Sequence, residues 1–241
     1  MIHLAVSEEF PLDHDLVVKI FDGIILMLSP LGETREELVY VVPSEDGPMC
    51  SRLRDATFII SLSCSGDPSG LQYAYQFAHE CCHWMIGGDL SGDRRGLFWL
   101  EETLCELASF YCLVLLRDQW TRLRPDYPLS SVDWYLEHTL LSGLPPSPLP
   151  LRGYIESHLE ELSAPEYHRD LYSQMALALL PHFLGYPALW LMLPYLGDLK
   201  SYSHPLEWLV SLPERLPEKL SPLLPRWWDL VLGAHLPHSQ R

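Results

Sequence analysis

The sequence predicts an α+β protein in which a small N-terminal sheet is followed by helices. Short runs rich in β-branched and aromatic residues, separated by Pro, Gly, Asp and Ser, fill the first 66 residues. Apolar residues at helical spacing take over between residues 73 and 116. From about residue 120, leucine-rich segments alternate with prolines, a pattern typical of short helices interrupted by breaks.

The N-terminal runs have the length and composition of strands. Because Pro, Gly, Asp and Ser separate them, we expect an antiparallel or mixed sheet. A run at residues 57–64, just before the first long helix, is also β-branched and ends in turn residues. The other four runs are IHLAV (2–6), LVVKIF (16–21), GIILML (23–28) and ELVYVV (37–42).

The segment FAHECCHWMIGG (77–88) places two histidines four residues apart on a predicted helix that ends at two glycines. His79 and His83 then share one face and can offer imidazole nitrogens to a single tetrahedral cation, with Glu80 beside them. The pattern HExxH is expected about 0.04 times by chance in a chain of this composition. The alternative is two histidines without a metal. The helical period itself comes from Tyr73, Phe77, Ala78, Cys81, Trp84 and Met85.

A catalytic zinc site also needs a third protein ligand and one open position. One candidate is Asp89, which follows His83 by six residues in a glycine turn. The other is Glu102, which follows His83 by 19 residues on a second predicted helix over 97–116. Glu106 lies one turn later on the same face, and the HExxH pattern with a Glu at both offsets is expected only about 0.0002 times by chance. The spacing therefore favours Glu102.

Residues 73–112 resemble the gluzincin metallopeptidases, in particular the aminopeptidase-N type. That family follows HExxH with the motif WLNEGFA, and this chain has WLEETL at 99–104. The resemblance implies a zincin-like catalytic lobe in which zinc is bound. By the same resemblance its residues are the zinc ligands His79, His83 and Glu102, the general base Glu80, and Glu106 as the carboxylate that orients a ligand imidazole.

The chemistry of these residue types supports the same roles. Zinc held by two imidazoles and one carboxylate makes a water more acidic and polarises a carbonyl, and Glu80 is placed to move the proton. We expect Glu101 to belong to a solvated acidic face, because consecutive helical residues cannot point at one metal. The prediction is a zinc-dependent, peptidase-like hydrolase that cleaves an amide bond. The alternative is a catalytically silent zincin fold used as a binding or interaction module.

The segment LYSQMALALLPHFLG (171–185) resembles the family's downstream helix, which opens with the tyrosine that stabilises the oxyanion. By that resemblance Tyr172 is the donor, and Tyr167, His168 and His182 are the alternatives. The family's G-x-M-E-N motif, which holds the free amine of a substrate, does not occur upstream of His79. Aminopeptidase specificity is therefore not implied, and the strand at 57–64 could instead serve as the edge that binds an extended peptide.

We expect two lobes, a catalytic one over 1–120 and a mostly helical one over 121–241 that completes the cleft. The most apolar stretch, at 175–197, contains prolines that divide it into pieces shorter than the ~20 residues that a bilayer requires. We therefore expect a buried helical hairpin there rather than a membrane span.

Net charge and cysteine content indicate which binding partners and which cellular compartment to expect. A formal net charge of −16 disfavours nucleic acid and anionic membranes as partners but says nothing about the reaction, and around the cleft it would favour basic or amine-bearing substrates. The predicted hydrolase makes a peptide or other amide the expected substrate. The N-terminus has no basic region followed by a long apolar core, so no signal peptide is expected. The six cysteines then fit a reducing, cytoplasmic location as small buried residues, with Cys82 or Cys105 closest to a metal.

Overall fold

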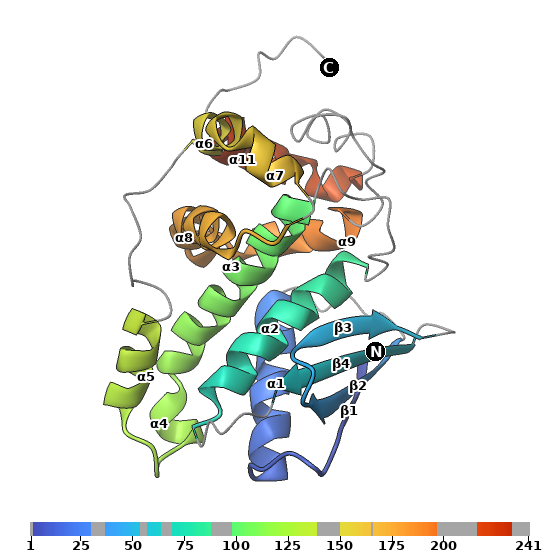
Figure 1. The fold of residues 1–241 in the computed structure, drawn as a ribbon, viewed down its shortest axis with the longest axis vertical. Coiled ribbons are helices and arrows are strands. Elements are labelled where there is room, and N and C mark those ends of the chain that lie inside the picture. Colours follow the sequence, from blue (N-terminus) through green and yellow to red (C-terminus); the bar gives the residue numbers. More distant parts are fainter. Residues whose placement is uncertain are drawn as a thin grey trace.

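The fold combines a small mixed sheet with a larger set of helices, as the α+β prediction requires (Figure 1). The strands are ordered β1-β2-β4-β3; β1, β2 and β4 run parallel, and β3 is antiparallel to β4. They span Ile2–Val6 (β1), Glu37–Ser44 (β2), Met49–Arg52 (β3) and Thr57–Ser63 (β4). The computed structural model describes residues 2–29, 37–53, 57–63, 69–87, 98–138, 150–164, 166–196 and 216–232.

The two runs predicted as strands at 16–21 and 23–28 are wrong, because together they form helix α1 (His14–Leu28). Asp13 caps this helix by accepting a hydrogen bond from the Leu16 backbone N–H at 3.0 Å. Its β-branched composition favours a strand, but the buried residues recur at helical spacing. These are Val17, Ile20, Phe21, Ile24, Ile25 and Leu28. The helix also explains why β1 and β2 are parallel, since such a pair needs a crossover connection.

The two helices that carry the motif residues lie at the centre of the molecule. Helix α2 (Leu71–Ile86) begins after Gly70 and ends at Gly87, both with positive φ, and nearly all of its residues are buried. Helix α3 (Phe98–Arg117) packs against it and is buried over most of its length. The predicted helices and the glycine stop at Gly87 are confirmed, whereas Gly88 lies outside the described residues.

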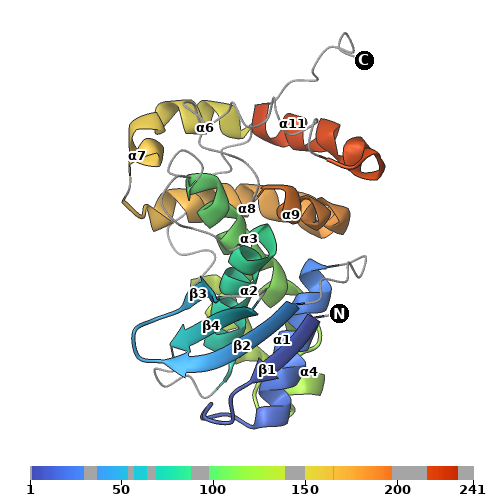
Figure 2. The same ribbon diagram turned by 90° about the vertical axis from the view of Figure 1, so that its right-hand side faces the viewer.

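Figures 1 and 2 show α8 and α9 over α2 and α3, with α6, α7 and α11 beyond them, whereas α4 lies at the opposite end of the molecule. One continuous cluster of buried apolar residues runs from Phe10 to Val231, so it crosses the predicted boundary at residue 120. The two-lobe division stays a prediction. The elements are α4 (Trp120–Leu123), α5 (Leu129–Leu136), α6 (Leu151–Ser157), α7 (Leu159–Ser163), α8 (Arg169–Gly185), η3 (Pro187–Met192), α9 (Leu193–Leu196), η5 (Glu218–Leu223) and α11 (Leu224–Leu232).

The apolar stretch at 175–197 forms parts of α8, η3 and α9, and its large side chains, such as Phe183 and Trp190, are buried. In the described part of the chain, no single helix is long and apolar enough to cross a membrane. The pair formed by α8 and the segment 187–196 meets those criteria only when joined, and it bends by 113° between the two halves. This agrees with the predicted hairpin.

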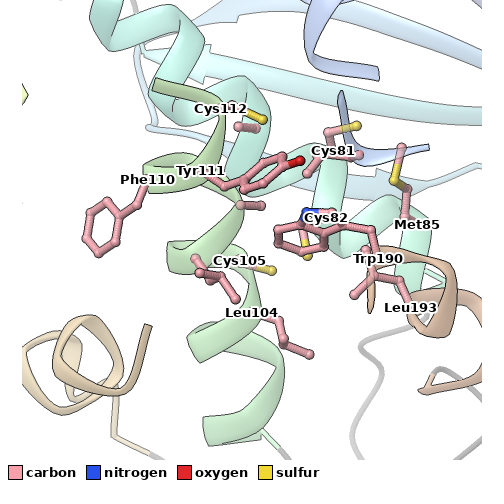
Figure 3. Close-up of a cluster of buried hydrophobic side chains, with 14 of the residues drawn as sticks. Cys81, Cys82, Met85, Leu104, Cys105, Phe110, Tyr111, Cys112, Trp190 and Leu193 are labelled. Carbon is pink, nitrogen blue, oxygen red and sulfur yellow. The ribbon is translucent and has the colours of Figure 1, made fainter. Parts of the chain in front are cut away.

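Buried cysteines line the contact between α2 and α3 (Figure 3). Cys82 of α2 and Cys105 of α3 interact with each other. Burial raises the pKa of Cys81, Cys105 and Cys112 well above the usual thiol value, so these thiols stay protonated. The expectation of small, buried, unpaired cysteines is confirmed for all five that the structure describes.

Candidate metal centre

The site lies where the antiparallel helices α2 and α3 face each other. Because the helices are antiparallel, residues later in α2 contact residues earlier in α3. Tyr75 contacts Glu106 and Ser109, His79 contacts Glu102, and His83 contacts Glu101 and Glu102. Each turn of one helix therefore places a polar residue opposite a polar residue of the other. This alignment brings the carboxylates of α3 to the two motif histidines.

Both imidazoles turn a nitrogen toward the carboxylate of Glu102. Nε2 of His79 lies 3.4 Å from one carboxylate oxygen, and Nε2 of His83 lies 3.5 Å from the other. These separations exceed the usual N–H···O distance of about 2.9–3.0 Å. They match the roughly 3.3–3.6 Å that separates two ligands of a tetrahedral zinc with bonds of about 2.0–2.2 Å. The three predicted ligand residues are brought together, and each imidazole nitrogen lies next to a different oxygen of the Glu102 carboxylate.

The carboxylate that orients an imidazole is Glu101, not Glu106. Glu101 Oε1 lies 2.9 Å from His83 Nδ1, the ring nitrogen that faces away from Glu102, and its side chain is buried. The prediction of a solvated Glu101 is therefore wrong. That prediction considered only whether Glu101 could contact the metal itself. In the structure, Glu101 contacts Nδ1 of the predicted ligand His83. Such a carboxylate fixes the tautomer and orientation of a ligand imidazole.

Glu106 has different partners from those predicted. It accepts hydrogen bonds from the hydroxyls of Tyr75 and of Tyr167, the latter at 3.2 Å, and it pairs with Arg169 at 3.3 Å. Its side chain is almost completely buried. No contact with a histidine is among these, so the predicted role of Glu106 on an imidazole is not supported by the geometry.

Negative charge accumulates at this helix pair. The carboxylates of Glu80, Glu101, Glu102 and Glu106 are all buried, with Arg169 as the one permanent cation in contact with them among the described residues. Burying carboxylates without compensation is costly, and a divalent cation would neutralise most of the excess. The same carboxylates affect the pKa of His83. Burial lowers this pKa, but the hydrogen bond with Glu101 and the charges of the surrounding carboxylates outweigh burial and raise the pKa to about 9.

A cavity of about 1010 Å³ opens over the two imidazoles and Glu102. Its walls come from α2, α3, the start of α8, strand β3 and the segment around Tyr135 and His138. The backbone N–H of Cys50 in β3 donates to the Glu80 carboxylate, which ties the strand to the helix. The sheet edge at the cavity is therefore β3, and the prediction that the strand at 57–64 forms this edge is wrong, since β4 lies between β2 and β3.

Cys105 is a second candidate for the third ligand position. Among the described residues, ligand atoms of His79, His83 and Cys105 all lie within 4.8 Å of one another. Cys105, however, also interacts with the buried Cys82. Glu102 has an oxygen next to each imidazole, so we favour it as the ligand. Asp89 lies outside the described residues, and its candidacy is not addressed by the structure.

The candidate oxyanion donors differ in whether they line the cavity. Tyr172 is completely buried, its hydroxyl donates to the Glu166 carbonyl at 3.4 Å, and it is not part of the cavity wall. His168 and His182 are also not in the wall. Tyr167 does line the cavity, and the charge of Glu102 is close enough to help raise its pKa, after burial and Glu106. The geometry thus favours Tyr167, which precedes the helix that carried the resemblance.

Comparisons with known proteins add no relative to this picture: no protein-family model matches the chain, and no curated protein matches it. The interpretation of the site therefore depends on its own geometry and on the motif spacing.

The two carboxylates that flank Glu102 allow a matched pair of substitutions. We expect Glu101→Gln to weaken zinc binding by about 10- to 100-fold, because an amide orients His83 less firmly and lowers its basicity. Glu106→Gln should change zinc affinity far less, since its partners are tyrosines and an arginine. Competition with a chromogenic zinc chelator measures both affinities. Equal losses in the two variants would contradict the assignment of Glu101.

Proposed function

We propose that the protein is a zinc-dependent, peptidase-like hydrolase of gluzincin type that cleaves an amide bond. The observation that carries this proposal is the convergence of His79, His83 and Glu102 at the base of a cavity that Glu80 also lines. A structural zinc site is closed by four protein ligands, whereas a catalytic one keeps a position open to a cavity. The cavity supports the catalytic arrangement.

The donor set fits zinc better than the other common divalent ions. Two imidazoles and one carboxylate are a ligand combination of catalytic zinc sites, whereas magnesium and calcium prefer sites made only of oxygen atoms. When bound, the ion would polarise the carbonyl of the substrate and make a water more acidic. The buried carboxylates around the site would provide the negative field that holds it.

Glu80 is the residue that would move the proton. It follows the first ligand on α2, lines the cavity, and is buried. Burial raises the pKa of its carboxyl above the usual value, while the two histidines act in the opposite direction. A carboxylate with a raised pKa takes a proton from water more readily and can return it to the leaving amine. The Cys50 N–H holds the group in place during both steps.

Strand β3 offers a surface for the backbone of a substrate. It is an edge strand of the sheet, and Pro48, Met49 and Cys50 line the cavity. An extended peptide could pair with this edge through main-chain hydrogen bonds, which are independent of its side chains. Its scissile bond would then lie between β3 and the ligands on α2, on the side of Glu80.

Tyr167 is the donor we propose for the oxyanion. Its hydroxyl has one proton, which it gives to Glu106 at 3.2 Å in this structure. To stabilise a tetrahedral intermediate, the hydroxyl has to exchange this acceptor for the developing negative charge, which also lies in the cavity. Tyr167 is partly exposed, so its side chain is not enclosed on all sides by the protein.

Two tyrosine-to-phenylalanine variants test this donor. We expect Tyr167→Phe to lower the turnover rate by about 10²-fold or more, in the range found for the removal of one oxyanion donor, while zinc stays bound. Tyr172→Phe removes a hydroxyl that points to the Glu166 carbonyl and should leave turnover within about threefold of the parent. Steady-state kinetics with any cleaved peptide measures both. The opposite order would return the role to Tyr172.

A catalytically silent zinc-binding module is the second candidate, and the position of Cys105 favours it. If Cys105 joined His79, His83 and Glu102 around the ion, four protein ligands would close the site and leave it structural. The two candidates thus differ in whether a fourth protein ligand is present.

The proposed function is tested by profiling the cleavage of peptides. Zinc-loaded protein is incubated with a peptide library prepared from a whole proteome, and newly formed termini are compared with those produced by Glu80→Gln. Termini formed only by the parent protein support the hydrolase and reveal its preferred bond. The same termini in both samples, or none in either, would contradict it.

A further inference from the structure

Arg169 is a cation in the wall of an otherwise acidic cavity. It is the first residue of α8, and no other arginine or lysine is among the described residues that line the cavity. Its side chain is 56% exposed, although its counterion, Glu106, is buried. An arginine that only neutralised Glu106 could be buried beside this carboxylate. The exposure of the Arg169 guanidinium therefore needs a second explanation.

The guanidinium is held firmly by one of its edges. Its Nε lies 3.3 Å from Glu106, its Nη2 donates to the Tyr75 hydroxyl at 2.8 Å, and its carbon lies 5.7 Å from the Tyr75 ring centroid. Nη1 donates no hydrogen bond to another residue in the described part of the chain. An arginine has five N–H donors in a planar fork, so this geometry leaves the Nη1 end of the fork available in the cavity.

A fixed guanidinium with unused donors is the group that proteins use to bind carboxylates. The bonds are charge-assisted, and little side-chain freedom is lost because the arginine is already immobilised. The surrounding wall presents Glu102, Glu106 and Asp170, whose charges repel an anion, whereas the guanidinium of Arg169 attracts it. The position of a bound carboxylate would therefore be closely defined.

We propose that Arg169 binds a carboxylate of the substrate, and that the site therefore prefers amide substrates that carry a carboxylate near the scissile bond. This inference rests on the proposed function, since it names the substrate class of the same site. The carboxylate can come from the free C-terminus of a short peptide or from an aspartate or glutamate side chain. Both present the same chemistry to the guanidinium.

The test measures binding without catalysis, in the zinc-loaded Glu80→Gln protein. The probes are a panel of N-acetyl dipeptides, each prepared as the free acid and as the C-terminal amide, together with N-acetyl-Gly-Glu amide. We expect the acids to bind about 10- to 100-fold more tightly than the matching amides, as for hydrogen bonds to a charged group. Preference for N-acetyl-Gly-Glu amide over N-acetyl-Gly-Gln amide would instead identify an acidic side chain as the ligand.

Substitution of Arg169 tests whether this residue causes the preference for carboxylates. Arg169→Met should reduce it to about threefold or less, and Arg169→Lys, which keeps the charge without the fork, should retain part of it. Arg169→Met leaves buried Glu106 without its counterion, so Arg169→Met/Glu106→Gln provides a variant in which both charges are removed. Arg152→Met is the matched control, because Arg152 is 55% exposed and pairs with Glu156 outside the cavity wall.

The outcomes separate this inference from the proposed function. Equal binding of acids and amides together with equal binding of the Glu and Gln amides, no binding of any probe, or a preference that survives in both Arg169→Met variants would overturn it; survival would mean that the carboxylate binds the metal instead. A carboxylate preference that depends on Arg169, found in a protein without hydrolase activity, would support the inference and contradict the proposed function alone.

Discussion

Replacing His79 and His83 together by alanine is expected to leave the purified protein without zinc, whereas the parent protein should hold about one zinc per chain. The reason is that both imidazoles face one carboxylate, and Glu102 alone is a weak ligand. Metal analysis after dialysis against a mild chelator measures the difference. Each single variant should retain less zinc than the parent, because one imidazole and one carboxylate cannot complete a tetrahedral site.

A stability measurement accompanies the metal analysis. A ligand that binds only the folded state raises the melting temperature, so added zinc should stabilise the metal-depleted parent but not the double variant. His182→Ala is the control, because His182 is exposed and lies outside the cavity wall; it should behave as the parent does. Stoichiometric zinc in the double variant would mean that the metal is held elsewhere in the chain.

Glu80→Gln is expected to keep the zinc and to lower the rate of hydrolysis by about 10²-fold or more. The amide has nearly the shape of the carboxylate, and its oxygen can still accept the Cys50 N–H, so the cavity should be preserved. What the amide lacks is the ability to accept a proton. Zinc content, the circular dichroism spectrum and steady-state rates of parent and variant together test this.

A second glutamate serves as the control for that substitution. Glu37 is hydrogen-bonded to Trp84 at 2.8 Å and lies outside the cavity wall, so Glu37→Gln makes the same chemical change away from the site. Its activity should stay within about twofold of the parent. Glu80→Gln with undiminished activity would exclude Glu80 as the general base, whatever the zinc content.

The parts of the site that could be predicted from the sequence are those determined by helical geometry and by the spacing of the motifs. His79, Glu80 and His83 lie within one turn of α2, so their relative placement follows from helical geometry. Glu102 and the helix that carries it followed from periodicity and from the spacing of the motif. The glycine end of α2 followed from its local conformation as well.

The roles of Glu101 and Glu106 could not be predicted in this way. The rotation and offset of α3 against α2 decide which carboxylate reaches a histidine, and both depend on how apolar side chains from several elements pack. That packing turns Glu101 toward His83 and Glu106 toward Tyr75. A signal for Glu101 was present, since it adjoins the ligand Glu102, but its direction could not be derived from the sequence.

Two errors in the fold have local causes. The β-branched residues of α1 suggested strands because composition was given more weight than the spacing of its buried positions. Strand β3 was missed because its four residues, MCSR, include no β-branched or aromatic residue; it forms only because β4 supplies a pairing partner. Tyr167 lies before α8, outside any motif, and only the tertiary fold brings it to Glu106.

The central claim is that His79, His83 and Glu102 bind one zinc ion at the base of the open cavity. A crystal structure of the zinc-loaded protein, with anomalous data collected on both sides of the zinc absorption edge, tests it most directly. We predict one anomalous peak about 2.0–2.2 Å from Nε2 of both histidines and from a Glu102 oxygen, with the remaining position facing the cavity. A peak bonded to the Cys105 sulfur, or the absence of a peak between these residues, would contradict the claim.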